Sequence, residues 1–467
     1  MEPICLERLD HLGVSASVIK DLGLIDMINA RLVPDAHEVL TPGEAVAGMI
    51  LNGLGVANRP VSLTPQFFAN KPLDRLFHEG LEAEHFNRFQ LGRTRDEAST
   101  YGGDALFQEL ALAVCAQEGI DQRCNHFDTT SFSLTGEDVP DSDEHAMRIT
   151  PGYSKDHRPD LKQVVLARMV SPDGGVPCVS KSWEGNTSDI HVFQERAQAL
   201  LTAVAQTPSP RYLVADATRY HVDNATHLKH MGFITRIPNT LSVVSQGIRQ
   251  ALEWETWHPV DANIRSQRLE LCHDGMAQRW LVVDSQAAFE RAAARLKQAT
   301  QREEEAITQT LFHLQAQRFP TPEAAYHALA AAAQRWQYHQ GQSSQLTEHP
   351  HYASKGRPTP RAPRKASAWH IQAHVRPAEE GVQDLQQVQA CYVLGTTISA
   401  RELSDPAAIA AYKNQSRVEG GFRLLKDPLF FVSSLFVKKP SRIEGLLMVM
   451  PLALLVYSVT QRRRRQQ

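Results

Sequence analysis

The residue pattern of the chain changes at residue 124, and this change limits the possible fold more than any other feature. From Cys124 the sequence CNHFDTTSFSL alternates with period two and is rich in β-branched and aromatic residues, which is typical of a half-buried strand. Two further apolar runs, QVVLARMV and GVPCVSKSW, flank turn residues from Ser171 to Gly175 and predict a hairpin. The short apolar run RYLVAD, which ends at Asp216, has the composition of a central strand covered on both faces. The sequence therefore predicts three consecutive strands and a separate central strand.

Helices and strands alternate after these three strands. A helical segment around residues 193–205 precedes RYLVAD, and a second helix separates it from the strand-like FITRIP that begins at Phe233. Three consecutive strands followed by alternating helices and strands is the order of an RNase H-like sheet. We therefore expect an α/β fold, in which an RNase H-like mixed sheet is flanked by helices, a helical N-terminal domain precedes it, and a partly β insertion precedes its last helix.

The chain has 467 residues, 42% of them hydrophobic, which is enough for several domains with a substantial core. We expect a helical N-terminal domain over 1–118, the first part of the core over 119–240, an insertion over 241–385, the second part of the core over 386–460, and a basic tail over 461–467.

The helical domain contains recognisable helix starts. Apolar residues at helical spacing predict a helix from Ser17 to Ala30, and Thr41 followed by a proline predicts an N-cap. A cap-like stretch from Thr94 to Glu97 predicts the start of a long helix towards Val114. These helices could read DNA ends as a helix-turn-helix or could serve only as a packing domain, and nothing in them identifies base-reading side chains.

The insertion combines both kinds of element. RSQRLELC and RWLVVDS predict strands, and residues from Gln286 to His339 predict a long helical stretch. The segment SKGRPTPRAPRKAS carries five basic residues and no acid, so we expect it to be extended and exposed. It is either a solvated linker or an arm that contacts phosphates.

Composition favours a cytoplasmic protein. The six cysteines lie far apart without zinc-ligand spacing, and the first residues lack the basic and apolar regions of a secretory signal. The apolar run from Leu446 to Val459 is interrupted by Pro451 and is shorter than the ~20 residues that cross a bilayer, so it predicts a buried core helix and no membrane partner. A net charge of −3 means that any DNA contact must come from local basic clusters.

One helix carries a carboxylate among polar and cationic groups. A helix is predicted to begin near Pro406. Five of its residues would lie along one side of it: Tyr412, Gln415, Glu419, Arg423 and Lys426. A neighbouring apolar stripe would dock this helix onto the core. The alternative is the charged face of an ordinary surface helix.

Two aspartates complete a possible metal site with Glu419. Asp128 lies in the first predicted strand and Asp216 ends the central strand, where ligands of α/β sheets gather. Alternatively, Asp128 is an ordinary strand or turn residue and Asp216 caps the next segment. Carboxylates are the ligands that Mg²⁺ prefers, and a pair of ions about 3.5 to 4 Å apart can activate an attacking oxygen and stabilise a leaving one.

The stretch from Tyr412 to Lys426 resembles the Y-x2-R-x3-E-x6-K signature of DDE transposases of insertion-sequence family four, with Glu419 as the acid. Other stretches resemble that family in the same order: FDTTSF around Asp128, GYSKDHRPDLKQ, GNTSD, VAD ending at Asp216, and FITRIP. The resemblance covers most of the chain, from about residue 7 to 460. It implies an RNase H-like catalytic domain with a largely β insertion before the Glu419 helix.

The resemblance also implies an activity and partners. Asp128, Asp216 and Glu419 would be the catalytic metal ligands of a bacterial enzyme that cleaves element ends and transfers strands into target DNA. Two Mg²⁺ ions are expected, with Mn²⁺ as a substitute, and the partners would be element ends, target DNA and a second copy in a homodimeric synaptic complex. The enzyme would be cytoplasmic and associated with the nucleoid when bound to DNA. DNA contacts would come from Tyr412, Gln415, Arg423 and Lys426, and from Lys155, His157, Arg158 and Lys162 of GYSKDHRPDLKQ.

One departure from the signature opens alternatives. Gln415 stands where the signature has arginine, which replaces a cationic phosphate contact by a neutral amide. A degenerate or regulatory DNA-binding protein, or an RNase H-like nuclease without strand transfer, would share the same motifs. By the resemblance, Trp254 or Trp257 could hold a flipped base, although a core role is the alternative for either.

Overall fold

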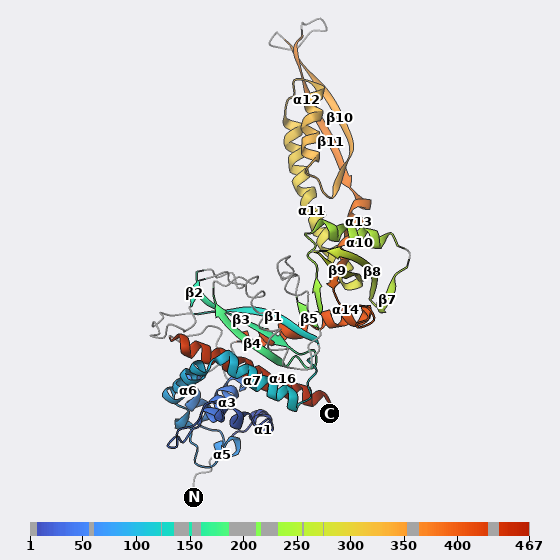
Figure 1. The fold of residues 1–467 in the computed structure, drawn as a ribbon. Helices are drawn as coiled ribbons and strands as arrows, with labels where there is room; N and C mark the ends of the chain where they lie inside the picture. Colours follow the sequence, from blue (N-terminus) through green and yellow to red (C-terminus); the bar gives the residue numbers. More distant parts are fainter. Residues whose placement is uncertain are drawn as a thin grey trace. The chain divides into compact units, whose positions relative to one another are not determined.

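A computed structural model describes residues 7–55, 60–122, 124–134, 149–151, 160–185, 212–215, 232–254, 256–273, 275–352, 364–427 and 439–466 (Figure 1). The chain forms two compact units. The first contains Met1–Pro238, Glu270–Arg279 and Leu394–Gln467, and the second contains Asn239–Leu269 and Trp280–Val393.

A mixed sheet organises the first unit. Its strands are β1 (Cys124–Ser133), β2 (Thr150–Pro151), β3 (Lys162–Val170), β4 (Pro177–Glu184), β5 (Tyr212–Ala215), β6 (Gly232–Arg236) and the part of β12 (Cys391–Thr396) from Leu394 onward. The order is β4-β3-β1-β5-β6-β12, and β2 pairs the beginning of β3. β1, β3 and β4 are antiparallel neighbours, whereas β5 and β6 run parallel to β1. This is the RNase H-like order that the sequence predicts, so the fold prediction is confirmed.

The β3–β4 hairpin shows why these residues form strands. Every residue of β3 after Lys162 is buried, which explains its nearly unbroken apolar run. The turn between the strands contains Gly174 and Gly175 with φ of 87° and 66°, a conformation that favours glycine. The Ser171 hydroxyl accepts a hydrogen bond from the Val176 N–H and closes the turn.

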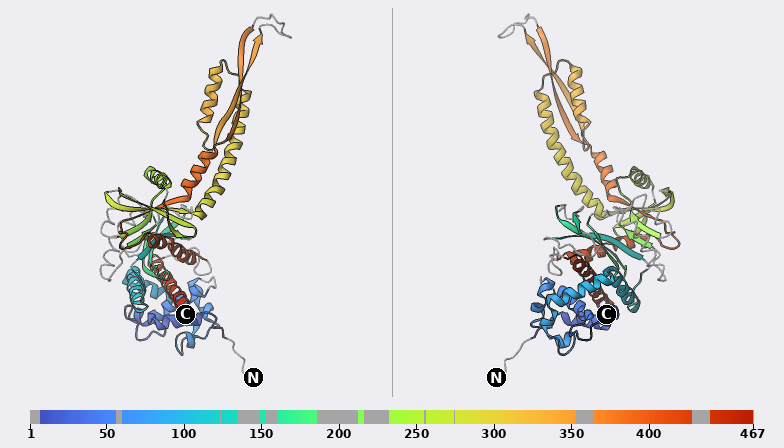
Figure 2. Two further views of the ribbon diagram at one scale, coloured as in Figure 1. Left: turned by 90° about the vertical axis from the view of Figure 1, so that its right-hand side faces the viewer. Right: turned by 60° about the vertical axis from the view of Figure 1, so that its left-hand side comes forward.

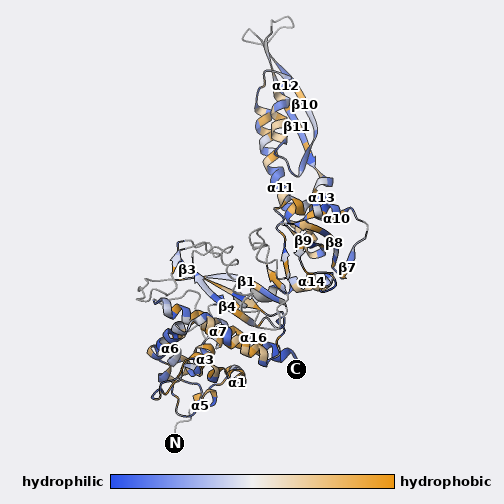
Figure 3. Cartoon of the chain, viewed as in Figure 1, coloured by the Kyte–Doolittle hydropathy of each residue, from blue (hydrophilic) through white to orange (hydrophobic). Residues whose placement is uncertain are grey.

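The helices of the first unit are α1 (Leu12–Asp21), α2 (Leu24–Asn29), α3 (Pro42–Leu54), α4 (Thr64–Phe68), α5 (Leu73–Leu76), α6 (Arg88–Tyr101), α7 (Gly103–Gln117), α14 (Asp405–Lys413), α15 (Ser416–Lys426) and α16 (Pro440–Gln466). Among them, α7 and α16 pack against β4, α15 packs against β1, and α14 packs against β5 and β6. α16 packs against α1, α3, α6, α7 and β4, and hydrophobic residues gather along it (Figure 3). It is long and apolar enough to cross a membrane, but 83% of its most apolar window is buried, as expected of a core helix.

The structure corrects two predicted helix boundaries. The helix expected from Ser17 to Ala30 is divided between α1 and α2 by Gly23, whose φ of 65° interrupts the helical backbone. Thr94 does not cap a helix. It lies buried inside α6 and its hydroxyl donates to the Gln90 carbonyl, while the next helix begins after Gly102, whose φ is 99°.

The second unit contains α10 (Ser242–Leu252), β7 (His258–Asp261), α11 (Gln286–Ala316), α12 (Pro322–Ala333), β10 (His339–Tyr352), β11 (Arg364–Pro377) and α13 (Glu379–Ala390), with parts of β8 (Ile264–His273) and β9 (Met276–Ser285). β8 and β9 are the strands predicted from RSQRLELC and RWLVVDS. β10 and β11 form an antiparallel two-stranded ribbon beside α11 and α12 (Figure 2).

The helical stretch expected from Gln286 to His339 consists of α11 and α12, and it ends at Ala333, since His339 begins β10. The Thr321 hydroxyl accepts from the Ala324 N–H and caps α12. Residues 354–363 of the basic segment lie outside the described residues, and its remaining residues begin β11.

Candidate active site

The backbone of Asp128 lies in the middle of β1, between two neighbouring strands. It faces Arg168 of β3 in the antiparallel register, and β1 pairs β5 in parallel, with His126 opposite Val214. The side chain of Asp128 lies outside the described part of the chain. Asp216 also lies outside it, directly after Ala215, the last residue of β5.

The helix expected from Pro406 to Lys426 consists of two helices, which corrects the prediction of one continuous stripe. The Ser404 hydroxyl caps α14 by accepting from the Ala407 N–H, and α14 ends at Lys413. The Gln415 N–H then donates to the Tyr412 carbonyl at 3.0 Å, a tighter turn than the helical one. Asn414 at this turn is a weak helix former, which favours the break.

An ion pair holds the start of α14 in place. Arg279 Nη1 donates to Asp405 Oδ1, and Nη2 donates to the Leu403 carbonyl at 2.8 Å. Both side chains of the ion pair are nearly buried, with relative exposures of 6% and 12%. The start of α14 is therefore held by one charge-assisted hydrogen bond to Asp405 and a second hydrogen bond to the backbone just before the helix.

The backbone of Glu419 lies in α15, the helix that packs against β1 and α16. Leu425 is fully buried and anchors this helix. A Cβ at Gly421 would lie 3.2 Å from Leu454 of α16, which shows how closely the two helices approach. The side chain of Glu419 lies outside the described residues, so the structure brings together the elements that carry Asp128 and Glu419 without describing their carboxyl groups.

The predicted DNA-contacting residues of these helices differ in exposure. Arg423 is exposed, and Tyr412 and Lys426 are half-buried. Gln415 is only 7% exposed, and its buried Oε1 has no hydrogen-bond donor among the described residues. An arginine at this position would have a largely buried charge, which is unfavourable without a partner. The burial of Gln415 is therefore compatible with the neutral amide that replaces the arginine of the signature.

Of the four DNA-contacting residues predicted in GYSKDHRPDLKQ, one lies within the described residues. Lys155, His157 and Arg158 lie outside the described residues, whereas Lys162 is the exposed first residue of β3. In the second unit, Trp254 is 39% exposed and the Arg265 guanidinium lies 4.8 Å from the centre of the Trp257 ring. The arginine and this ring form a cation–π pair.

Where side chains are described, no three His, Cys, Asp or Glu residues gather as a metal site. The carboxyl groups of the three predicted ligands are outside that set. Sequence reasoning missed one notable charge, Arg168 of β3, which is 0% exposed and faces Asp128 in the strand register. Its signal was present: it is the one charged residue within the apolar run QVVLARMV.

Comparison with known proteins adds a family match and a weak structural likeness. Residues 4–112 match a domain of unknown function, DUF4277. No curated protein matches the chain. Among solved structures, the chain is similar to a piggyBac transposase in a synaptic complex with hairpin DNA, with 9% sequence identity, coverage of 97% of this chain and 73% of that one, and a TM-score of 0.35. A TM-score this low does not establish a common fold, so the fold rests on the strand order.

Proposed function

We propose that this protein is a DDE transposase that cleaves DNA at the ends of a transposable element and transfers the strands into target DNA. The support is the agreement between the motif order and the observed strand order. The motif acids fall on β1, directly after β5, and on α15, the helix that packs against β1.

The register between β1 and β5 carries the proposal. Cys124, Asn125 and His126 pair in parallel with Tyr212, Leu213 and Val214. The same offset in residue number relates Asp128 to Asp216, so each aspartate comes two positions after the last pair of this ladder, His126 and Val214. Neighbouring strands of a sheet lie about 4.8 Å apart. Two acids so placed, with Glu419 on the adjoining helix, would suit a shared metal site.

The chemistry of this donor set fits magnesium. Asp128, Asp216 and Glu419 supply carboxylate oxygens, the ligands that Mg²⁺ and Mn²⁺ favour, from a strand, a strand end and a helix. Two bound ions would stabilise the developing charge on the attacking and leaving oxygens of a phosphodiester.

Other residues would bind and orient the DNA. Arg423 and Lys426 follow Glu419 on α15, and their cationic groups would hold phosphates near the cleaved bond. Tyr412 would add a hydroxyl contact, and Lys162 with Lys155, His157 and Arg158 would extend the basic surface. A homodimer would bring two element ends together. We place the protein in the bacterial cytoplasm, at the nucleoid when bound to DNA.

Glu419→Gln tests the proposal directly. The amide keeps the size of the side chain but removes its charge. Loss of a residue that only contacts a metal ligand costs about 10- to 100-fold, so loss of a ligand itself should cost more. We therefore expect Mg²⁺-dependent cleavage of DNA carrying the native ends to fall by more than about 100-fold. Asp128→Asn and Asp216→Asn should behave alike. End binding measured without metal should remain close to that of the parent protein.

Glu402→Gln is the matched control, since it removes an exposed carboxylate shortly before α14. It should cleave as the parent does. Cleavage by Glu419→Gln at the parent rate would refute the three-acid site. Release of cut ends without joined product would instead indicate a nuclease.

A second candidate function is supported by Gln415. Since this residue is neutral and nearly buried, one phosphate contact of the signature is absent from its usual place. A regulatory protein that occupies element ends without cutting them would tolerate this change. Binding of the ends without metal-dependent cleavage by the parent protein would favour it.

A further inference from the structure

Arg168 is a fully buried arginine in β3. Its neighbours along the strand, Ala167 and Met169, are also buried and apolar. A guanidinium remains charged at any ordinary pH, and burial without a negative partner is strongly unfavourable. We therefore expect a carboxylate to lie close to the Arg168 guanidinium.

The sheet register places one acid opposite it. Arg168 and Asp128 face each other across the antiparallel pair of β3 and β1. Residues that face each other in such a pair lie on the same face of the sheet, with Cβ atoms about 4.5 to 5.5 Å apart. Asp128 therefore occupies the position in the neighbouring strand from which a carboxylate would meet the guanidinium.

The guanidinium also adjoins the helix of the third acid. A Cβ built on Gly421 of α15 would lie 3.2 Å from Arg168 Nη2 and 3.3 Å from Nη1. Gly421 comes two residues after Glu419, and it leaves the space that the guanidinium needs. At Gly420, by contrast, no atom of the described residues lies within 4 Å of an added Cβ.

We propose that Arg168 is a positioning residue of the active site: its guanidinium holds the Asp128 carboxylate and sets the distance between β1 and α15, and thus between Asp128 and Glu419. This inference rests on the proposed function, because the distance matters only if both acids bind the same metal ions. Gly421 is part of the arrangement, since a larger residue would press α15 away from the guanidinium.

The adjacent glycines provide a matched pair of variants. Gly421→Ala adds a methyl group against the guanidinium, whereas Gly420→Ala adds the same group at an exposed position of the same helix, away from every described side chain. We expect Gly421→Ala to weaken Mn²⁺ binding by the full-length protein about 10- to 100-fold, with a similar loss of cleavage, because outer-shell changes have effects of this size. Gly420→Ala should match the parent in both measurements. Mn²⁺ is titrated into each protein without DNA, and electron paramagnetic resonance measures the bound fraction. This measurement of affinity does not depend on cleavage activity.

Arg168→Lys separates this contact from the contact of Gly421 with Leu454. The slimmer ammonium group leaves room for a methyl group but lacks the planar fork that holds a carboxylate. Gly421→Ala should therefore cause a smaller further loss in the Arg168→Lys background than in the parent, with thermal unfolding used to confirm that each variant folds.

Two outcomes overturn the inference. The first is equal Mn²⁺ affinity in Gly421→Ala and Gly420→Ala, or no Mn²⁺ binding in either. The second is an effect of Gly421→Ala that is unchanged by Arg168→Lys. If instead Glu419→Gln cleaves as well as the parent, the proposed function itself fails, and this result is distinguishable because it does not involve either glycine.

Discussion

At the scale of single residues, burial raises the pH at which the thiol of Cys391 ionises. Burial, with the nearby Asp284 carboxylate, raises the pKa of this thiol to about 12. The unfolded thiol ionises near pH 8.5. Stability from the protonated thiol is therefore fully present below about pH 8.5 and is lost as the pH rises towards 12, since only the unfolded state then releases the proton.

Cys391→Ala tests this pH dependence. We expect the unfolding free energy of the parent, minus that of the variant, to fall by up to about 1.4 kcal/mol per pH unit above pH 8.5. Urea unfolding between pH 7 and 10 measures this difference. The cavity left by the alanine shifts all values equally, so a difference that stays constant with pH would contradict the prediction.

The same scale shows which site residues a sequence can reveal. Asp128 and Glu419 are candidates because they lie in recognisable motifs. Asp128 lies in a predicted strand, whereas Glu419 lies in the second of two helices where one was predicted. Arg168 could not be assigned, since only the register shows that it faces Asp128 and only three-dimensional packing places it against Gly421. The burial of Gln415 likewise depends on how α14 and α15 pack, which spacing along the chain does not specify.

At the scale of elements, the start of α3 shows a local signal that determines structure. The Thr41 hydroxyl accepts from the Glu44 N–H at 3.3 Å, and Glu44 Oε2 accepts from the Thr41 N–H at 2.9 Å. This capping box satisfies two N–H groups that the helix itself leaves unpaired.

Removing this cap should destabilise the first unit measurably. We expect Thr41→Ala to lower the unfolding free energy by about 1 kcal/mol. Thr100→Ala, at an exposed position inside α6, is the control and should be neutral or slightly stabilising, because alanine is the better helix former. Denaturant unfolding of both variants measures the effect, and equal losses would show that the cap contributes nothing specific.

Element identity was predictable where the signal is local, and boundaries were not. The β3–β4 hairpin follows from its turn residues, and α3 follows from its cap. The division of α1 from α2 at Gly23 and of α14 from α15 at Gln415 depends on single backbone turns within otherwise helical sequences. Helical periodicity continues across such turns, so it predicts one helix where the structure has two.

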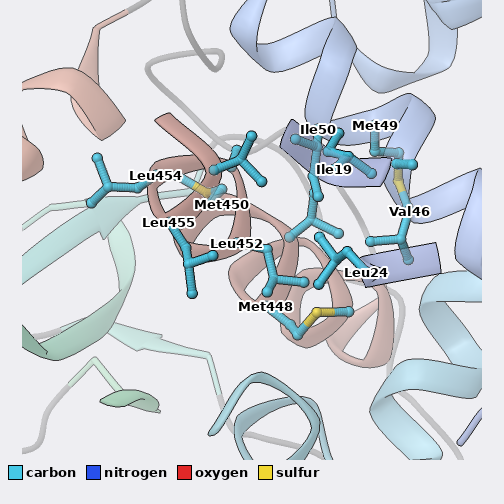
Figure 4. Packing of buried hydrophobic residues seen from close by; sticks show 14 of the residues in the cluster. Ile19, Leu24, Val46, Met49, Ile50, Met448, Met450, Leu452, Leu454 and Leu455 are labelled. Carbon is cyan, nitrogen blue, oxygen red and sulfur yellow. The ribbon is translucent and has the colours of Figure 1, made fainter. Parts of the chain in front are cut away.

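At the scale of the whole molecule, the first unit is held together by residues from both ends of the sequence. One hydrophobic core joins the N-terminal helices, β3 and α16. Figure 4 shows Leu452 of α16 beside Leu24 of α2, with Val46 and Ile50 of α3 close by. The apolar run predicted a buried helix, but its partners were not predictable, because hydrophobic pattern shows that a face is buried and not what covers it.

This shared core predicts that damage to α16 weakens the N-terminal helices as well. Leu452 is fully buried, and Leu452→Ala should lower the unfolding free energy of the first unit by about 2 to 5 kcal/mol through lost contacts and the remaining cavity. Hydrogen exchange should then quicken in α3 as much as in α16, because both unfold with the same core. Tyr457→Ala changes a 40% exposed residue of the same helix and should have a much smaller effect. If exchange quickened in α16 and stayed unchanged in α3, the N-terminal helices would form an independent folding unit, and their contacts with α16 would be incidental to their stability.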